Sequence, residues 1–211
     1  VKGFDLRYES GKFLMDVQFA NNLWEAVELG LPGVHNAENA LAVCAMSLKL
    51  GLSEIEIRSG LKNFKGVKRR FEYQWKGKEL IYIDDYAHHP TEIEALVSSI
   101  RLLYPDKKVT GIFQPHLFSR TRDFLDGFKA ELSKLDQVIL LPIYPAREEP
   151  IPGITSDVLV KGIGAKALLM QPEEVLEWAR KQNEGVVLTI GAGDIDRIVL
   201  TLKSIFEHND N

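Results

Sequence analysis

From Thr91 onward, short apolar segments alternate with amphipathic segments that repeat apolar residues every three or four positions. The first kind is typical of buried strands and the second of helices. Strands separated by one helix run parallel, because the helix carries the chain back across the sheet. The pattern predicts an α/β fold with a doubly wound, mostly parallel sheet. The predicted strands are residues 108–113, 137–141, 165–170 and 186–190.

Capping residues mark two helix starts in this region. Thr91 stands three residues before Glu94, as in a capping box, and Asp194 precedes the last apolar repeat. The other helices are expected at residues 121–135, 155–162 and 172–182, with a proline-rich loop at 143–154. Residues 207–211 are expected to fray.

The first 65 residues follow a different pattern. Residues 4–8 and 12–19 alternate apolar and polar side chains around a turn, which predicts a β-hairpin, and residues 21–33 read as irregular. A helix is predicted from an N-cap at Asn36, and a second from the capping box of Ser53 and Glu56. The periodicity stops at residues 65–68, which predicts a domain junction there. Beyond it, residues 71–75 and 79–83 predict a second hairpin.

Composition narrows the classes of partner. With a net charge of −4 and a pI of about 5.8, the chain lacks the basic footprint of nucleic-acid binding, and its basic run at 65–70 reads as a solvated linker. No apolar run approaches the roughly 18 residues of a membrane span. The single cysteine, Cys44, lies among apolar residues, where packing is its expected role. These features indicate a reducing compartment such as the cytoplasm, with neither nucleic-acid nor membrane partners.

Residues 81–92, IYIDDYAHHPTE, carry the densest polar cluster. They predict a strand that ends on Asp84 and Asp85, and then a loop with Tyr86, His88 and His89. Ligands of open α/β sheets bind at the carboxyl ends of strands. The cluster therefore predicts either a metal site or a polar-substrate site beside a nucleotide, with solvated loop residues as the third interpretation. Successive side chains point opposite ways, so we expect His89 to cap or pack rather than share a ligand with His88.

A second polar cluster, FQPHLFSRTR, follows the next predicted strand along the chain. We expect the two strands to be neighbours with their tips at one sheet edge. His116 and Arg120 stand four residues apart at a helix start and predict an anion cradle, because arginine grips a carboxylate through two parallel hydrogen bonds. Arg122 falls inside the helix and reads as a surface residue. The glycines of Gly191-Ala192-Gly193-Asp194 favour a tight turn over a phosphate cradle.

Three motifs stand in order along the chain: GVHNAENA, VKRRFE leading into DDYAHHPTE, and FQPHLFSRTRD. Together with YPAREEPIPG and GAGDID, they resemble the carboxyl-terminal half of the Mur ligases over nearly the whole chain. The resemblance implies that residues 1–65 are the tail of a central ATPase domain and 66–211 a Rossmann-like amino-acid-binding domain. It also implies that the UDP-sugar domain and the phosphate-binding loop lie outside this chain, so we do not expect the chain to act alone.

The resemblance is strongest to family members that join L-alanine to the carboxylate of UDP-N-acetylmuramate through an acyl phosphate, with ATP and Mg²⁺. It implies cytoplasmic enzymes of peptidoglycan precursor synthesis, whose ATP and metal ligands lie mainly in the missing amino-terminal domains. The ATP-binding positions it matches are His35, Asn39, Arg70 and Asp85.

The positions that match the amino-acid site are Tyr86, His88, His116 and Arg120. Arg120 would bind the alanine carboxylate, and His88 and His116 are the candidate proton acceptors. The family commonly has Arg-Tyr where this chain has Leu117-Phe118, so one cationic contact is missing.

Two alternatives stay open. One is the related ligase that recycles a tripeptide onto UDP-N-acetylmuramate, which shares the Asp-Asp-x-Ala-His-His-Pro segment. The other is a metal-dependent phosphohydrolase that uses Asp84, Asp85, His88 and His89.

Overall fold

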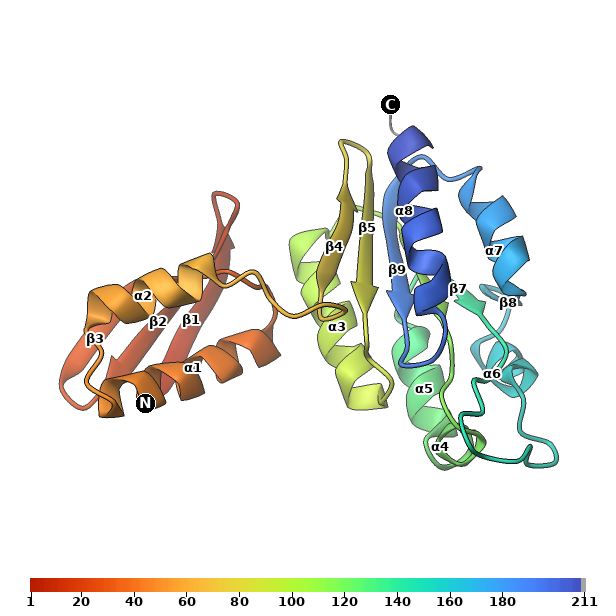
Figure 1. Cartoon of the computed structure of the whole chain (residues 1–211), viewed down its shortest axis with the longest axis horizontal. Helices are drawn as coiled ribbons and strands as arrows, with labels where there is room; N and C mark the ends of the chain where they lie inside the picture. Colours follow the sequence, from red (N-terminus) through yellow and green to blue (C-terminus); the bar gives the residue numbers. More distant parts are fainter. Residues whose placement is uncertain (210–211) are drawn as a thin grey trace. The chain divides into compact units, whose positions relative to one another are not determined.

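The computed structural model describes residues 1–209 (Figure 1). The chain divides into two compact units, each with its own core. The first comprises Val1–Val67 with Ser98–Leu103, and the second comprises Lys68–Val97 with the residues from Tyr104 onward. Within the described residues, no helix combines the length and apolar character needed to cross a lipid bilayer.

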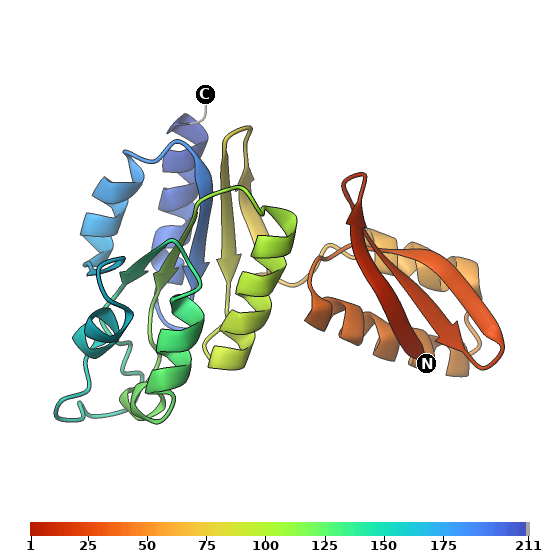
Figure 2. The ribbon, with the colours of Figure 1, turned by 180° about the vertical axis from the view of Figure 1, so that it is seen from behind.

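The first unit is an antiparallel sheet with two helices on one face (Figures 1 and 2). The strands pair in the order β1-β2-β3, and buried apolar side chains of β2, β3, α1 and α2 form the core. The elements are β1 (Lys2–Glu9), β2 (Lys12–Phe19), β3 (Asn22–Leu29), α1 (Val34–Lys49) and α2 (Glu54–Asn63).

The predicted hairpin and the capping box of Ser53 and Glu56 are confirmed, while two other predictions are wrong. Residues 21–33 are not irregular, because they contain β3. Helix α1 has Gly33, not Asn36, at its N-cap. Asn36 lies inside the first turn, where its Nδ2 donates to the Pro32 carbonyl oxygen at 2.6 Å.

The second unit is a six-stranded mixed sheet in the order β4-β5-β9-β6-β7-β8. Only the β4–β5 pair is antiparallel, so the predicted α/β fold with a mostly parallel sheet is confirmed. The strands are β4 (Glu72–Lys76), β5 (Leu80–Asp85), β6 (Val109–Phe113), β7 (Gln137–Leu140), β8 (Ala167–Leu169) and β9 (Gly185–Ile190).

Helices cover both faces of this sheet. Helices α7 and α8 pack on one face through an apolar cluster that includes Val175, Leu202 and Phe206 (Figure 1). Helices α3 and α5 cover the other face (Figure 2), where Phe113 of β6 packs against Phe128 with ring centroids 5.3 Å apart. The helices are α3 (Pro90–Leu103), α4 (Phe118–Asp123), α5 (Leu125–Leu132), α6 (Ser156–Ile163), α7 (Pro172–Ala179) and α8 (Asp196–Asn209).

Several predicted helix boundaries in this unit are wrong. Helix α3 begins at Pro90, so Thr91 does not precede it, and the helix predicted at 121–135 is two helices that meet at Phe124. Helix α8 begins two residues after Asp194. It continues to Asn209, whose Nδ2 donates to the carbonyl oxygens of residues 179 and 182, so residues 207–209 do not fray. Residues 210 and 211 lie outside the described part.

The most consequential correction concerns strand order. The strands that end in the two polar clusters, β5 and β6, are not neighbours, because β9 lies between them and pairs with both. In register, Ile190 of β9 lies opposite both Asp85 and Phe113. All three strands run parallel, so the loop after β9 enters the same edge as the two polar clusters.

Candidate active site

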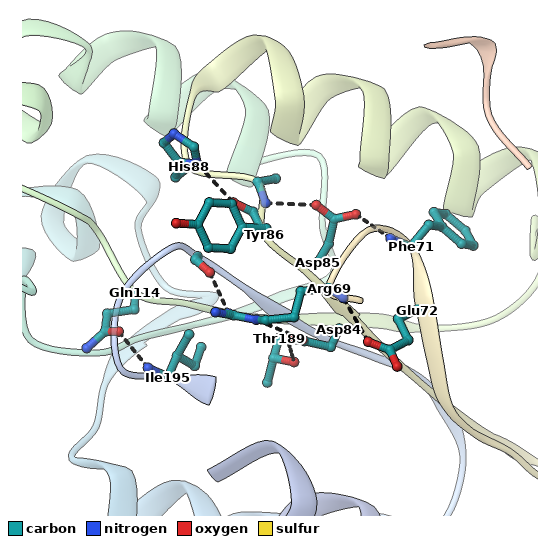
Figure 3. Close-up of polar contacts among 12 residues, drawn as sticks. Arg69, Phe71, Glu72, Asp84, Asp85, Tyr86, His88, Gln114, Thr189 and Ile195 are labelled. Carbon is teal, nitrogen blue, oxygen red and sulfur yellow. Dashed lines mark hydrogen bonds and ion pairs between the residues drawn. The ribbon is translucent and has the colours of Figure 1, made fainter. Parts of the chain in front are cut away.

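The two aspartates that end β5 serve opposite faces of the sheet. The side chain of Asp84 is 1% exposed and accepts hydrogen bonds from Arg69 Nε at 3.0 Å and from Thr189 Oγ1 at 2.6 Å (Figure 3). Burial raises the pKa of Asp84, although Thr189 and Arg69 both oppose this shift. Asp84 is therefore a buried structural carboxyl that depends on its arginine.

Asp85 accepts two backbone hydrogen bonds instead. Its carboxylate oxygens receive the N–H of Phe71 at 2.7 Å and of Ala87 at 2.8 Å (Figure 3). Burial raises the pKa of Asp85 to about 6, and the two amides and the charge of Arg70 counteract only part of that effect. The carboxylate thus fixes the start of β4 against the loop that carries the candidate site residues.

Arg69 ties together three segments at this edge. Besides Asp84, its guanidinium donates from Nη2 to the carbonyl oxygen of Gly191 at 2.6 Å, after β9. Its backbone N–H donates to Glu72 at 2.7 Å, and its carbonyl oxygen accepts the Tyr86 N–H at 2.6 Å. The residue adopts a positive φ of 59°, a conformation that side chains usually avoid. The interpretation of residues 65–70 as a solvated linker is therefore wrong at Arg69, whose side chain is 19% exposed.

Tyr86 lies beside two cations and one histidine. The guanidinium carbons of Arg69 and Arg70 lie 5.2 and 5.5 Å from the centre of its ring, within cation–π range. Its ring contacts that of His88 edge-on, with centroids 5.3 Å apart. Arg70 is about half exposed, so its charge faces solvent at the site while Arg69 is committed to the fold.

Glu92, in the first turn of α3, holds the His88 loop. Its Oε2 accepts the backbone N–H of His88 at 2.8 Å and of His89 at 3.2 Å, and lies 3.3 Å from the His88 ring Nδ1. Its Oε1 lies 3.5 Å from Arg70 Nη1. The carboxylate therefore connects the two candidate binding groups, Arg70 and His88.

The loop after β6 brings the second polar cluster to the same place. The rings of His88 and His116 lie with centroids 6.3 Å apart, and Arg120 Nη1 lies 3.4 Å from His116 Nδ1. The ring of Tyr144 stacks on His116 at 5.6 Å, and a parallel bridge joins their backbones. Burial, followed by the charges of Arg120 and His88, lowers the pKa of His116.

The loop after β7 supports the helix that carries Arg120. The Leu117 N–H donates to the Tyr144 carbonyl oxygen at 2.9 Å. Glu148 accepts the backbone N–H of Ser119 at 2.9 Å and also its hydroxyl group. These bonds fix the start of α4, which has no side-chain cap at Leu117.

The loop after β9 joins the site through Gln114. This side chain accepts the Ile195 N–H at 2.8 Å (Figure 3). It also donates to Asp194 at 2.8 Å. Gly191 has a φ of 145°, and a side chain there would meet the Gln114 carbonyl oxygen at 2.8 Å. The expected tight turn is present, and the side chain of Asp194 serves Gln114.

The structure thus places six predicted site residues at one edge of the second unit: Arg70, Asp85, Tyr86, His88, His116 and Arg120. The other two, His35 and Asn39, lie early in α1 of the first unit. His89 packs against Phe124 with ring centroids 4.5 Å apart, as expected, and Arg122 pairs with Asp123 at 2.7 Å.

Sequence reasoning missed Arg69 and Glu92. A buried aspartate at the end of a strand needs a cationic partner. The position of Asp84 could therefore have pointed to an arginine such as Arg69. The signal for Glu92 was a glutamate three residues after His89 at a helix start, the spacing of a capping box. In residues 1–209, no three or more His, Cys, Asp or Glu side chains are grouped so as to hold a metal ion.

Comparison with known proteins gives the same family from sequence and from structure. Residues 69–193 match the family described as Mur ligase, glutamate ligase domain. The UDP-N-acetylmuramate–L-alanine ligase of Flavobacterium johnsoniae is 44% identical over 209 residues, which are 99% of this chain and 46% of that protein. The ligase of the same description from Cytophaga hutchinsonii is 46% identical over 200 residues, covering 94% of this chain and 43% of that protein.

Among solved structures, the UDP-N-acetylmuramate–alanine ligase MurC of Thermotoga maritima superposes with a TM-score of 0.69 at 28% identity. The match covers 93% of this chain and 42% of that one. A murein peptide ligase of Psychrobacter arcticus has a TM-score of 0.60 at 19% identity over 97% of this chain and 43% of that one, which shows a shared fold. The chain spans slightly less than half the length of the relatives it matches.

Proposed function

Because this chain belongs to the Mur ligase family, we propose that it is the carboxyl-terminal part of an ATP-dependent ligase joining L-alanine to the carboxylate of UDP-N-acetylmuramate. The observation that carries the proposal is the convergence of His88, His116 and Arg120 beside Tyr86 and Arg70 at the carboxyl edge of a parallel sheet. This edge offers cations for anionic groups and imidazoles for proton transfer.

Each group has a chemical task in the proposal. The Arg120 guanidinium binds the alanine carboxylate, and Tyr86 forms one wall of the amino-acid site. Arg70, half exposed and linked to Glu92, reaches ATP. Asp85 accepts hydrogen bonds from two backbone amides and so organises the nucleotide side of the site.

The reaction begins with transfer of the ATP γ-phosphoryl group to the UDP-N-acetylmuramate carboxylate. The alanine amine then attacks the acyl carbon, and phosphate leaves. These residues bind and orient alanine by its carboxylate, and the histidines handle its amine protons. Mg²⁺ would neutralise the ATP phosphates, with its ligands supplied mainly by the amino-terminal domains of the full-length enzyme.

We assign residues 1–65 to the tail of the ATPase domain and 66–211 to the amino-acid-binding domain. The compact units of the structure and the start of the family match at residue 69 support this division. His35 and Asn39 would bind adenine from the first of these domains. We place the enzyme in the cytoplasm, where its substrates UDP-N-acetylmuramate, L-alanine and ATP are present and where the lone, buried Cys44 stays reduced.

The test is a ligation assay on the full-length polypeptide that carries this chain. We expect ATP-dependent formation of UDP-N-acetylmuramoyl-L-alanine, detected by mass spectrometry, and an increased KM for alanine in the Arg120→Lys variant. Preference for the tripeptide over alanine would instead identify the recycling ligase. ATP-independent release of phosphate from phosphomonoesters would identify the hydrolase, although Asp84 and Asp85 are already engaged by Arg69 and by backbone amides.

A further inference from the structure

Two histidines face the candidate amino-acid site, and their ring nitrogens have different partners. His88 Nδ1 lies 2.9 Å from the Tyr86 carbonyl oxygen and 3.3 Å from Glu92 Oε2. A carbonyl oxygen and a carboxylate only accept hydrogen bonds, so Nδ1 of His88 carries a proton. In the neutral ring, the free lone pair is therefore on Nε2.

His116 has the opposite arrangement. Its Nδ1 lies 3.4 Å from Arg120 Nη1, and a guanidinium group has only N–H donors. Nδ1 of His116 therefore accepts, and the proton of the neutral ring is on Nε2. Burial, with the nearby charges of Arg120 and His88, lowers the pKa of His116, so this ring is neutral near pH 7 and donates through Nε2.

The Glu92 carboxylate is held from several sides and cannot easily turn away from His88. Besides the ring contact, it accepts the His88 and His89 backbone N–H groups and lies against Arg70. Burial by itself would raise the pKa of Glu92, but the His88 backbone N–H and the neighbouring His88 and Arg70 side chains together lower it below its ordinary value. The Nδ1–H of His88 is therefore bonded to a backbone carbonyl oxygen with the Glu92 carboxylate beside it. A base that is oriented by a third group in this way is the arrangement that activates nucleophiles in many enzymes.

We infer that His88, through Nε2, is the group that takes the proton from the incoming alanine ammonium, and that Glu92 is the positioning residue that holds His88 for this step. His116 then binds substrate as a hydrogen-bond donor. The inference rests on the proposed ligase function. The sequence indicated both histidines as candidate proton acceptors, and the inference gives that role to His88 and the role of hydrogen-bond donor to His116.

The ammonium passes one proton to Nε2 of neutral His88, which leaves a neutral amine and an imidazolium. The amine lone pair forms the C–N bond to the acyl phosphate, and the C–O bond to phosphate breaks with its electron pair. The second amine proton leaves with the phosphate, and the imidazolium later returns its proton to solvent.

The tautomers can be observed directly in the 211-residue chain. With ¹⁵N-labelled histidine and at a pH where both rings are neutral, we expect a protonated Nδ1 in His88 and a protonated Nε2 in His116. Glu92→Gln should change the ¹⁵N chemical shifts of the His88 ring, whereas Glu94→Gln, which alters an exposed carboxylate of the same helix, should not. A protonated Nε2 in His88 of the unaltered chain overturns the inference without touching the ligase proposal.

Kinetics of the full-length enzyme test the role itself. Hydroxylamine is uncharged near neutral pH and needs no base, so it should still trap the acyl phosphate as a hydroxamate in the His88→Gln and Glu92→Gln variants. With alanine, kcat should fall about a hundredfold or more for His88→Gln and about tenfold for Glu92→Gln, with KM little changed.

The outcomes separate the two proposals. Normal alanine ligation by His88→Gln refutes the assignment of His88, and so does loss of both hydroxamate and amide in that variant alone. Absence of both products from the unaltered enzyme refutes the proposed function instead.

Discussion

Replacing Arg69 by methionine should strongly destabilise the second unit. The variant keeps an apolar stem of similar length but leaves Asp84, 1% exposed, without its cation, and removes the bond to the Gly191 carbonyl oxygen. Removing one partner of a buried ion pair typically costs about 3–5 kcal/mol.

Protonation of Asp84 limits the part of this cost that comes from the unpaired charge. Starting from the ordinary carboxyl pKa of 3.8, adding a proton at pH 7 costs about 4 kcal/mol, and that route is open to the variant. We therefore expect a loss of about 3–4 kcal/mol in the free energy of unfolding, or about 10 °C in Tm. Acidification should reduce the loss, because the buried carboxyl then protonates at lower cost.

The assay is urea unfolding followed by tryptophan fluorescence in a Trp24→Phe background, which leaves Trp75 and Trp178 as reporters of the second unit. Arg70→Met is the matched control. Arg70 is about half exposed, and surface pairs of this kind contribute about 0–1 kcal/mol. The double change Arg69→Met with Asp84→Asn should recover most of the loss. A loss below about 1 kcal/mol for Arg69→Met, or an equal loss for Arg70→Met, would refute the reasoning.

Three further predictions concern other residues. Gly191→Ala should lower the free energy of unfolding by about 1–3 kcal/mol in the same assay. The reason is that Gly191 has a φ of 145° and the new side chain would meet a carbonyl oxygen. The control Gly153→Ala, at a glycine with a positive φ but open space around it, should lose less stability. The folded-state pKa of Asp85, about 6, lies above its ordinary value of 3.8, so this group should remove about 1 kcal/mol of stability between pH 5 and 7. That slope should be absent from Asp85→Asn, and an unchanged slope contradicts the assignment. Cys44 is buried, and burial raises its pKa, so thiol reagents should label it only as fast as the first unit unfolds; rapid labelling of the folded chain contradicts this.

Much of the second unit could be predicted because its strands are buried on both sides and its helices carry a regular apolar repeat. The missed strand β3 shows where this logic fails. Its buried residues Trp24 and Val27 are three positions apart, since Ala26 has a φ of 49° and the β2–β3 register shifts between Met15 and Val17. A strand with such an irregularity loses the alternation by which strands are recognised.

The candidate site could likewise be predicted only in part. The polar tips of β5 and β6 were visible as clusters in the sequence, and the structure brings them together. What no local pattern shows is the order of strands, so the insertion of β9 between them could not be foreseen. Likewise, Arg69 reads as one charge in a basic run until the fold buries Asp84 beside it.

The central place of β9 also has a consequence for synthesis on the ribosome. Strands β5 and β6 both need β9 as their hydrogen-bonded neighbour, yet β9 is the last of the six strands to leave the exit tunnel. Until β9 emerges, β5 and β6 each have an edge whose backbone N–H and C=O groups are unpaired. Unpaired strand edges of this kind promote aggregation. The growing polypeptide therefore most needs protection by chaperones between the emergence of β6 and the emergence of β9.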